Sequence, residues 1–454
     1  MIVSFSVSNF RSFSTEETLS LVASKRLSGT HQEHTASIPD SDERVLRTAV
    51  IYGANGAGKS NLFKALQYLR RMALEPQKKD GGTGREAFRL GETAKDPSSF
   101  DLQFIADGKL YRFGLKVNDQ RVTEEWLVRV VKGRERLIYE RITDQNGKVT
   151  VEKQGLRASG EKVVALATVG GLQNQSFLAT AFANLQPSEL GEDLRLVAMW
   201  FSGDLLMIAP DSKLRVLSQI LAKDQSLRTF AGDFLKSSST GIDHLDVLER
   251  EITEEDIRKT LPENLAADLA GMEDESAAVF SVGQDEYLVE RVQDKHRYYR
   301  VTVQAAHDGP ANAPVPLEIA EESDGTRRLL ELIPALYDLR NRDATYFVDE
   351  IDRSMHPLLV WKFIQFFLNS CTNANRQLIV TTHESNLLDL DLLRRDEIWF
   401  AEKDPNGATR LYSMVDFKVR KDHEIRKHYL QGRFGAVPFL GNVDRLLETE
   451  NSPE

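Results

Sequence analysis

A glycine-rich loop between a short apolar strand and a helix constrains this chain more than any other feature. Residues 48–52 read TAVIY, the loop GANGAGKS follows at 53–60, and apolar residues recur at helical spacing over 61–73. This order is typical of a P-loop, where backbone N–H groups at a helix N-terminus converge on phosphate oxygens. Within the loop, Lys59 supplies a charge for the β- and γ-phosphates, and the Ser60 hydroxyl can bind Mg²⁺. The predicted phosphate-binding residues are Gly53, Asn55, Gly56, Ala57, Gly58, Lys59, Ser60 and Asn61.

A second apolar strand, at 346–348, ends in two carboxylates, Asp349 and Glu350. Ligands of open α/β sheets bind at the carboxyl ends of the strands, so this strand brings both acids to the ligand-binding edge. We expect Asp349 to hold Mg²⁺, directly or through water, and Glu350 to polarise an attacking water. An acidic pair after a strand is also common as a solvated strand end. The P-loop in the same chain favours the functional interpretation.

Two further segments carry candidate site residues. The buried strand 378–382 delivers His383 to the same edge, where its imidazole could contact the γ-phosphate. The run ESDGT at 322–326 precedes a helix predicted over 325–341, where Ser323 suits the N-cap and Gly325 permits close backbone approach to an anion. Alone, a strand-end histidine is more often structural and such a helix start is more often an ordinary cap. The order of the motifs along the chain favours functional roles for both.

The pattern of the remaining sequence predicts an α/β protein. Short apolar strands that alternate with helices, such as the helix at 357–370, imply a mostly parallel sheet flanked by helices. Residues 99–151 form alternating runs joined by Asp107-Gly108 and Asn146-Gly147, which predict hairpins and hence an antiparallel β subdomain. Residues 175–270 are predicted to be a largely helical lobe, with the acidic run 249–256 as a solvated helix.

We expect three parts along the chain. Residues 1–155 form an ATPase lobe that contains the P-loop and the antiparallel β subdomain. Residues 156–315 form a mainly helical insert, or second lobe, with strands returning at 286–306. Residues 316–454 carry the remaining motifs and a C-terminal tail.

The composition limits compartment and partners. The 58 Lys and Arg against 69 Asp and Glu give a net charge of −11, so the chain lacks the positive field of a passive DNA coat, and any nucleic-acid contact must be local. The single cysteine, Cys371, cannot form an internal disulfide, which favours the reducing cytoplasm. No apolar run of about 18 residues occurs, so we expect no membrane span.

A segment near the C-terminus is locally basic, although the chain as a whole is acidic. It could contact DNA or an acidic partner. A solvated helix face, with Asp422 and Glu424 forming ion pairs along the helix, is an equally good interpretation. The basic residues are Lys418, Arg420, Lys421, Arg426, Lys427, His428 and Arg433, with Tyr429 and Phe434 among them.

In this order the motifs resemble the ABC-type ATPase heads of the SMC, RecF and OLD group. The runs FSVSNFRSF and IYGANGAGKSNLFKAL resemble that group's first strands and P-loop, and VDEIDRSMHP resembles its Walker B and D-loop, with Asp352 in the D-loop. More closely, SNFRSFSTEETLSLVAS and HYLQGRFGAVPFL resemble the bacterial AAA-family ATPases of abortive-infection and related phage-defence operons. The resemblance covers the core motifs and both ends, but not residues 155–315.

This resemblance implies a homodimer, or a higher oligomer, that sandwiches ATP and Mg²⁺ and hydrolyses the ATP. Ser323 and Gly325 of one subunit would close over the γ-phosphate held by the P-loop of the other, with Asp352 nearby and Glu350 and His383 as catalytic residues. The signature ESDGT departs from the usual Leu-Ser-Gly-Gly-Gln, which argues against a transporter head. The Q-loop glutamine stays open among Gln103, Gln173 and Gln175.

The resemblance further implies a switch in an anti-phage system that controls a separately encoded effector, expected to be a Toprim-like nuclease. Only about 70 residues follow His383, which is short for a fused nuclease domain. The alternative is a RecF/SMC-like DNA-binding ATPase that acts in DNA repair. A transporter ATPase subunit is disfavoured by the SNFRSF opening.

Overall fold

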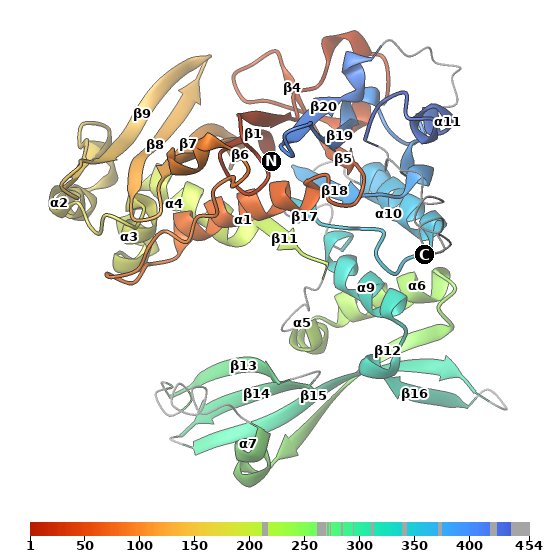
Figure 1. Cartoon of the computed structure of the whole chain (residues 1–454). Helices are drawn as coiled ribbons and strands as arrows, with labels where there is room; N and C mark the ends of the chain where they lie inside the picture. The colour runs from red at the N-terminus through yellow and green to blue at the C-terminus, as the bar shows by residue number, and fades with distance from the viewer. Residues whose placement is uncertain are drawn as a thin grey trace, which may run out of the picture. The chain divides into compact units, whose positions relative to one another are not determined.

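The computed structural model of the 454-residue chain forms two compact units (Figure 1). The first consists of Met1–Pro210, Arg340–Asp352 and Trp361–Glu454, and the second of Asp211–Leu339 and Arg353–Val360. The predicted division into 1–155, 156–315 and 316–454 stays a prediction. The structure describes residues 1–210, 217–260, 269, 272, 274–282, 285–293, 295–309, 313–337, 343–370, 375–417 and 425–436.

A six-stranded, mostly parallel sheet is the centre of the first unit. Its strand order is β11-β17-β18-β5-β19-β20, where β20 is antiparallel to β19 and the other neighbours are parallel. Side chains of β5, β17 and β18 are buried throughout, as expected for strands covered on both faces. This confirms the predicted α/β fold class. The strands are β11 (Leu205–Ile208), β17 (Ala344–Val348), β18 (Arg376–Thr382), β5 (Thr48–Tyr52), β19 (Ile398–Lys403) and β20 (Thr409–Ser413).

The predicted antiparallel β subdomain is a seven-stranded sheet in the same unit. The order is β10-β9-β8-β7-β6-β1-β2. Asp107 and Gly108 both have positive φ, 47° and 67°, which fits the tight turn predicted between β6 and β7. The strands are β1 (Ile2–Ser8), β2 (Glu17–Ser20), β6 (Ser98–Ala106), β7 (Lys109–Val117), β8 (Val122–Val131), β9 (Arg134–Thr143) and β10 (Val149–Val151).

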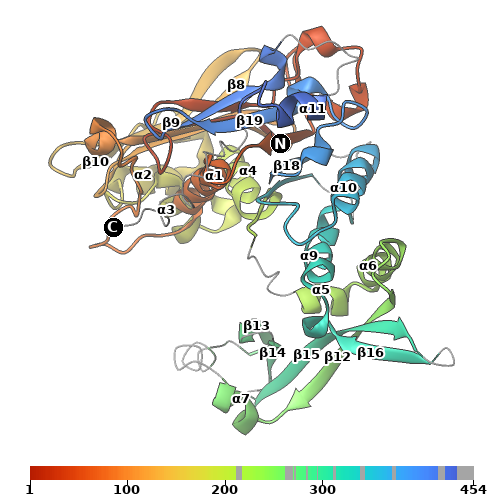
Figure 2. The ribbon, with the colours of Figure 1, turned by 45° about the vertical axis from the view of Figure 1, so that its right-hand side comes forward.

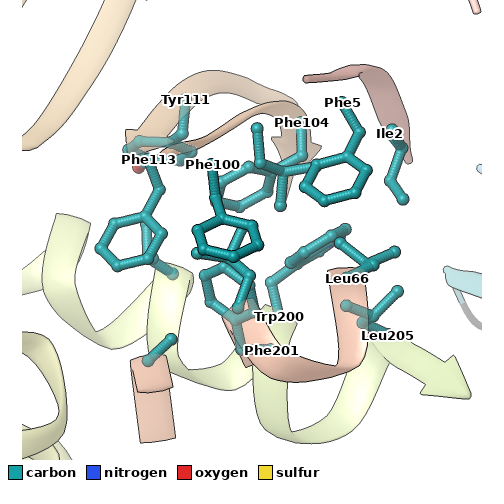
Figure 3. Close-up of a cluster of buried hydrophobic side chains, with 14 of the residues drawn as sticks. Ile2, Phe5, Leu66, Phe100, Phe104, Tyr111, Phe113, Trp200, Phe201 and Leu205 are labelled. Carbon is teal, nitrogen blue, oxygen red and sulfur yellow. The ribbon is translucent and has the colours of Figure 1, made fainter. Parts of the chain in front are cut away.

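Aromatic side chains form the core under this antiparallel sheet (Figure 3). The ring centroids of Phe104 and Trp200 are 4.2 Å apart, and those of Phe113 and Phe201 are 5.4 Å apart. Leu66 of α1 (Lys59–Leu74) joins the same cluster. The helix that follows the P-loop is thus fixed by its buried face.

The other elements of the first unit include the confirmed helix at 357–370, whose first residues belong to the second unit. The segment between β2 and β5 contains a two-stranded sheet, formed by β3 and β4. Among the described residues, no helix is long and apolar enough to cross a bilayer. The elements are β3 (Thr35–Ser37), β4 (Arg44–Leu46), α2 (Glu161–Val169), α3 (Phe177–Asn184), α4 (Glu192–Met199), a π-helical turn (Trp200–Asp204), α10 (Pro357–Ser370) and α11 (Ile425–Leu430).

The second unit packs helices on an antiparallel sheet. The sheet order is β12-β15-β14-β13, with β16 also paired to β15, and α6 and α9 lie side by side (Figures 1 and 2). The strands returning at 286–306 are thereby confirmed. The elements are α5 (Leu217–Lys223), α6 (Gln225–Ser237), β12 (Ile242–Ile252), α7 (Glu254–Thr260), β13 (Ser276–Val282), β14 (Asp285–Val292), β15 (Lys295–Asp308), β16 (Pro314–Glu318) and α9 (Asp324–Leu332).

Two helix predictions in this unit are wrong in part. The acidic run 249–256 is not one helix, because β12 continues to Ile252 and α7 begins at Glu254. Charged side chains suit β12 because it is an edge strand, whose pairing with β15 overrides local propensity. The helix predicted over 325–341 ends at Leu332 in a 3₁₀ turn that contains Pro334, which has no N–H to donate. Residues 338–341 and Cys371 lie outside the described residues.

Candidate functional site

The P-loop has the local structure that its sequence predicts. Strand β5 ends at Tyr52, and α1 begins at Lys59 with Gly58 as its N-cap. Gly58 has φ 109°, a value that favours glycine, and a Cβ there would lie 2.0 Å from Thr409 Oγ1. The loop therefore requires glycine at this position for two reasons, backbone conformation and space.

Lys59 is held at the loop by its own backbone carbonyls. Its Nζ donates to Gly53 O at 2.6 Å and to Ala54 O at 3.2 Å. Burial lowers the pKa of Lys59, although the carboxylates of Asp352, Asp349 and Glu350 act in the opposite direction. The ammonium and all three predicted acidic residues therefore share one electrostatic environment.

Two residues that sequence reasoning missed support the loop from outside. Thr409 Oγ1, on β20, lies 2.8 Å from both the Ala57 carbonyl oxygen and Ser12 Oγ. Ser12 Oγ in turn accepts from Asn61 Nδ2 at 2.7 Å. Ser12 belongs to the SNFRSF run, so that motif held a signal for this contact, whereas nothing in the sequence marked Thr409.

The acidic pair follows β17, two strands from β5, and β18 lies between them. Thr381 of β18 contacts both acidic residues: its hydroxyl donates to Asp349 Oδ1 at 2.5 Å and accepts the backbone N–H of Glu350 at 2.8 Å. Asp349 is 2% exposed, whereas Glu350 is half-buried and has a left-handed φ of 50°. Such backbone strain is common at functional sites. The side chain of Asp349 is therefore fixed by Thr381, whereas Glu350 is held through its backbone and keeps a partly exposed side chain.

His383 and Asp352 are brought together at the same edge. His383 Nε2 lies 3.1 Å from Asp352 Oδ2, and the side chains are 54% and 6% exposed respectively. The histidine is therefore oriented by a carboxylate while its ring stays accessible. This arrangement suits the predicted contact with a phosphate.

Ser323 and Gly325 lie in the second unit, at the start of α9. Ser323 Oγ accepts the Thr326 N–H at 3.1 Å, which is an N-cap bond. A Cβ on Gly325 would lie 2.5 Å from the Ser354 carbonyl oxygen, so the glycine allows close backbone packing. The ordinary cap geometry is present, and the phosphate contact predicted for these residues stays a prediction.

The donor set predicted for Mg²⁺ fits that ion. Ser60 and Asp349 offer a hydroxyl and a carboxylate oxygen, and Mg²⁺ prefers oxygen ligands. Ser60 is in the first turn of α1, and Thr381 orients Asp349. Both residues would hold the ion beside the phosphates, where it would neutralise developing charge.

The basic C-terminal segment is open to a DNA contact, an acidic partner or a solvated helix face, and its two aromatic residues do not favour the DNA contact. Tyr429 and Phe434 are 4% and 6% exposed, and both rings pack on Phe400 of β19, at 5.8 and 5.9 Å. Buried rings cannot stack on bases. Lys418, Arg420 and Lys421 lie outside the described residues.

The glutamine candidates for the Q-loop differ in their surroundings. Gln175 is buried, accepting the Gln77 N–H at 2.8 Å and donating to Thr180 at 2.8 Å. Gln103 lies within β6. The Q-loop assignment stays open.

The P-loop follows one parallel strand, and the acidic pair follows another strand at the same edge of the same sheet. This arrangement defines the class of P-loop ATPases. The family described as "AAA domain, putative AbiEii toxin, Type IV TA system" matches residues 49–162 and 174–389, which is more than half of the chain. The chain belongs to this family. A comparison with curated proteins gives no match.

Solved SMC heads are similar to the chain at low sequence identity. The SMC head bound to the C-winged helix domain of ScpA is 14% identical, with a TM-score of 0.39 over 91% of this chain and 97% of that one. The SMC head domain from Thermotoga maritima is 12% identical, with a TM-score of 0.37 over 92% and 99%. The Pyrococcus furiosus head with an extended coiled coil, bound to the C-terminal domain of ScpA, is 13% identical, with a TM-score of 0.36 over 91% and 96%.

Proposed function

We propose that this protein is an ATP-hydrolysing switch of a bacterial anti-phage system of the abortive-infection type, acting in the cytoplasm. In this proposal ATP drives dimerisation, hydrolysis reverses it, and the change controls a separately encoded effector, a Toprim-like nuclease. The observation that carries the ATPase part is the order β17-β18-β5. It sets Glu350, His383 and the P-loop at the ends of three adjacent parallel strands.

Each site residue has its own role in the proposed hydrolysis of ATP. Loop N–H groups and Lys59 bind the β- and γ-phosphates of ATP, and Ser60 and Asp349 hold Mg²⁺, which supplies charge neutralisation. Glu350 accepts a proton from water as the water oxygen attacks the γ-phosphorus. The bond from the γ-phosphorus to the β,γ-bridging oxygen breaks, and ADP leaves with the bonding electrons. His383, oriented by Asp352, stabilises the charge on the γ-phosphoryl oxygens.

The dimer part rests on Ser323 and Gly325 at the start of α9. A helix N-terminus favours an anion, so this segment of one subunit is suited to close over the γ-phosphate bound by the other. Two equivalent sites then form across one two-fold interface. The family match, whose description names a putative AbiEii toxin of a Type IV TA system, supports a role in such a system.

The decisive experiment uses Glu350→Gln, which keeps the shape of the side chain and removes the base. We expect the variant to bind ATP, to lose hydrolysis, and to accumulate as an ATP-dependent dimer in light scattering, because ligand persists when turnover stops. Wild-type protein with ADP is the control. An unchanged mass with and without ATP would contradict the switch, and unchanged hydrolysis would contradict the role of Glu350.

The effector is tested separately, by tagged purification from the native host and mass spectrometry after a salt wash. A stoichiometric small nuclease supports the defence switch. Recovery of DNA with repair proteins, and binding to duplex DNA that weakens steeply with salt, would instead favour the RecF-like alternative. The burial of Tyr429 and Phe434 removes base stacking by these two rings from that alternative.

A further inference from the structure

Three potential metal ligands converge in the segment before β3, in the first unit. Glu33 Oε1 lies 3.4 Å from His31 Nδ1 and 3.7 Å from His34 Nε2, and the imidazole centroids are 4.7 Å apart. One ligand atom from each residue lies within 4.8 Å of the other two. Among the described residues, no other group of three or more His, Cys, Asp or Glu side chains meets this criterion. Ligands at 2.0–2.1 Å from a tetrahedral Zn²⁺ are about 3.3–3.4 Å apart. The separations of Glu33 Oε1 from His31 Nδ1 and from His34 Nε2 are therefore already close to the ligand–ligand distances of a metal site.

Each histidine is oriented through its other ring nitrogen. His34 Nδ1 lies 3.1 Å from Oε1 of Glu397, which is fully buried. His31 Nε2 lies 3.1 Å from the Leu390 carbonyl oxygen. A carbonyl only accepts, so this His31 nitrogen carries the hydrogen, and a neutral ring then presents its Nδ1 lone pair toward Glu33. A carboxylate and a backbone carbonyl are the usual partners of metal-binding histidines.

The segment is anchored to the fold by a buried arginine. Arg394, which is 2% exposed, donates to the carbonyls of Leu27, at 3.1 Å, and Thr30. Asp396, paired with Arg394, accepts the Ser24 N–H at 2.7 Å. The ligands are thus held by contacts that do not involve a metal, as a preorganised site requires.

Charge and exposure also suit a cation. The Glu33 carboxylate, a negative group, faces one nitrogen of each imidazole. The His34 side chain is 4% exposed, that of His31 25% and that of Glu33 60%. The candidate site is therefore buried at His34 and accessible to water at Glu33.

We propose that His31 Nδ1, Glu33 Oε1 and His34 Nε2 bind one divalent transition-metal ion of the Zn²⁺ type, with water completing the coordination. Two imidazoles and one carboxylate favour such an ion over Mg²⁺, which prefers oxygen ligands. This site is distinct from the Mg²⁺ site at Ser60 and Asp349.

The test uses the full chain, purified without a polyhistidine tag, stripped with EDTA and held in excess Mg²⁺ without nucleotide. Calorimetric titration with Zn²⁺ and visible absorption after Co²⁺ addition report binding directly, without any activity assay. We expect one equivalent in the wild type, and at least ~10-fold weaker binding in His31→Gln and Glu33→Gln. Both side chains reach solvent, so we expect both variants to fold.

His244→Gln is the matched control. His244 is 48% exposed and contacts two carboxylates, but Asp243 faces its Nδ1 and Asp246 its Nε2, so the two acids cannot share one ion with a single ring nitrogen. We expect wild-type Zn²⁺ affinity in this variant. Absence of binding by the wild type would show an ordinary histidine–glutamate ion pair and overturn the proposal. Undiminished affinity in both His31→Gln and Glu33→Gln would do the same.

Discussion

Thr381 Oγ1 donates a hydrogen bond of 2.5 Å to Asp349 Oδ1, from the strand next to the one that delivers this acid. The same oxygen accepts the backbone N–H of Glu350 at 2.8 Å. One neutral hydroxyl therefore fixes the predicted Mg²⁺ ligand and the predicted catalytic base together. Its removal should disturb hydrolysis more than folding.

Thr381→Val removes this hydroxyl at nearly constant shape. We expect the ATP hydrolysis rate constant to fall about 10-fold or more, since a hydrogen bond to a charged group contributes about 1.5–3 kcal/mol. Steady-state kinetics with a circular-dichroism check of folding measures this. Thr345→Val on β17 is the matched control: that hydroxyl is fully buried, and no hydrogen-bond partner is found for it in the described structure. If both variants hydrolyse ATP at the wild-type rate, the Thr381 hydroxyl has no role in hydrolysis.

The motifs that could be predicted are those in which a few neighbouring residues set both conformation and chemistry. The loop at 53–60 and the strand before Asp349 are of this kind, because glycine conformation and apolar runs are local signals. Contacts of Ser12 with Thr409 and of Asp349 with Thr381 join residues far apart in sequence, and only the folded sheet brings them together. The error at Glu249 has the same origin, since pairing with β15 decides that β12 is a strand.

Lys59→Ala removes the charge that the P-loop offers to phosphate. We expect ATP affinity to fall by more than ~100-fold, about 2.7 kcal/mol, in calorimetric titration. Lys64→Ala is the matched control, because Lys64 is an exposed lysine on the same helix. Undiminished ATP affinity in Lys59→Ala would refute the assignment of this loop as the nucleotide site.

Gly58→Ala tests whether the loop conformation itself is required. The new Cβ would meet Thr409 Oγ1 at 2.0 Å, and a positive φ costs a non-glycine residue about 1–2 kcal/mol. We expect a loss of at least ~2 kcal/mol in the free energy of unfolding, measured with urea, and weaker ATP binding. Gly29→Ala, where no atom lies within 4 Å of the new Cβ, should change stability by less than ~0.5 kcal/mol. Similar stabilities of the two variants would mean that the loop tolerates a side chain at position 58.

Ser323→Asp separates the cap from the phosphate contact. Aspartate caps a helix as well as serine, so the bond to the Thr326 N–H and the start of α9 should persist. Its negative charge would face the γ-phosphate bound by the other subunit. We therefore expect normal ATP affinity at the P-loop, with ATP-dependent dimerisation and hydrolysis lost, in calorimetry, light scattering and phosphate release.

Ser323→Thr is the control for this variant, because it keeps both the cap and the hydroxyl and should retain hydrolysis. If Ser323→Asp hydrolyses ATP at the wild-type rate, Ser323 acts only as the cap of α9. Another residue of the second subunit must then contact the γ-phosphate. That outcome would leave the roles of Lys59 and Glu350 intact, because both belong to the first unit. If ATP binding itself is lost, the segment acts on the P-loop of its own subunit, and the arrangement across the dimer is wrong.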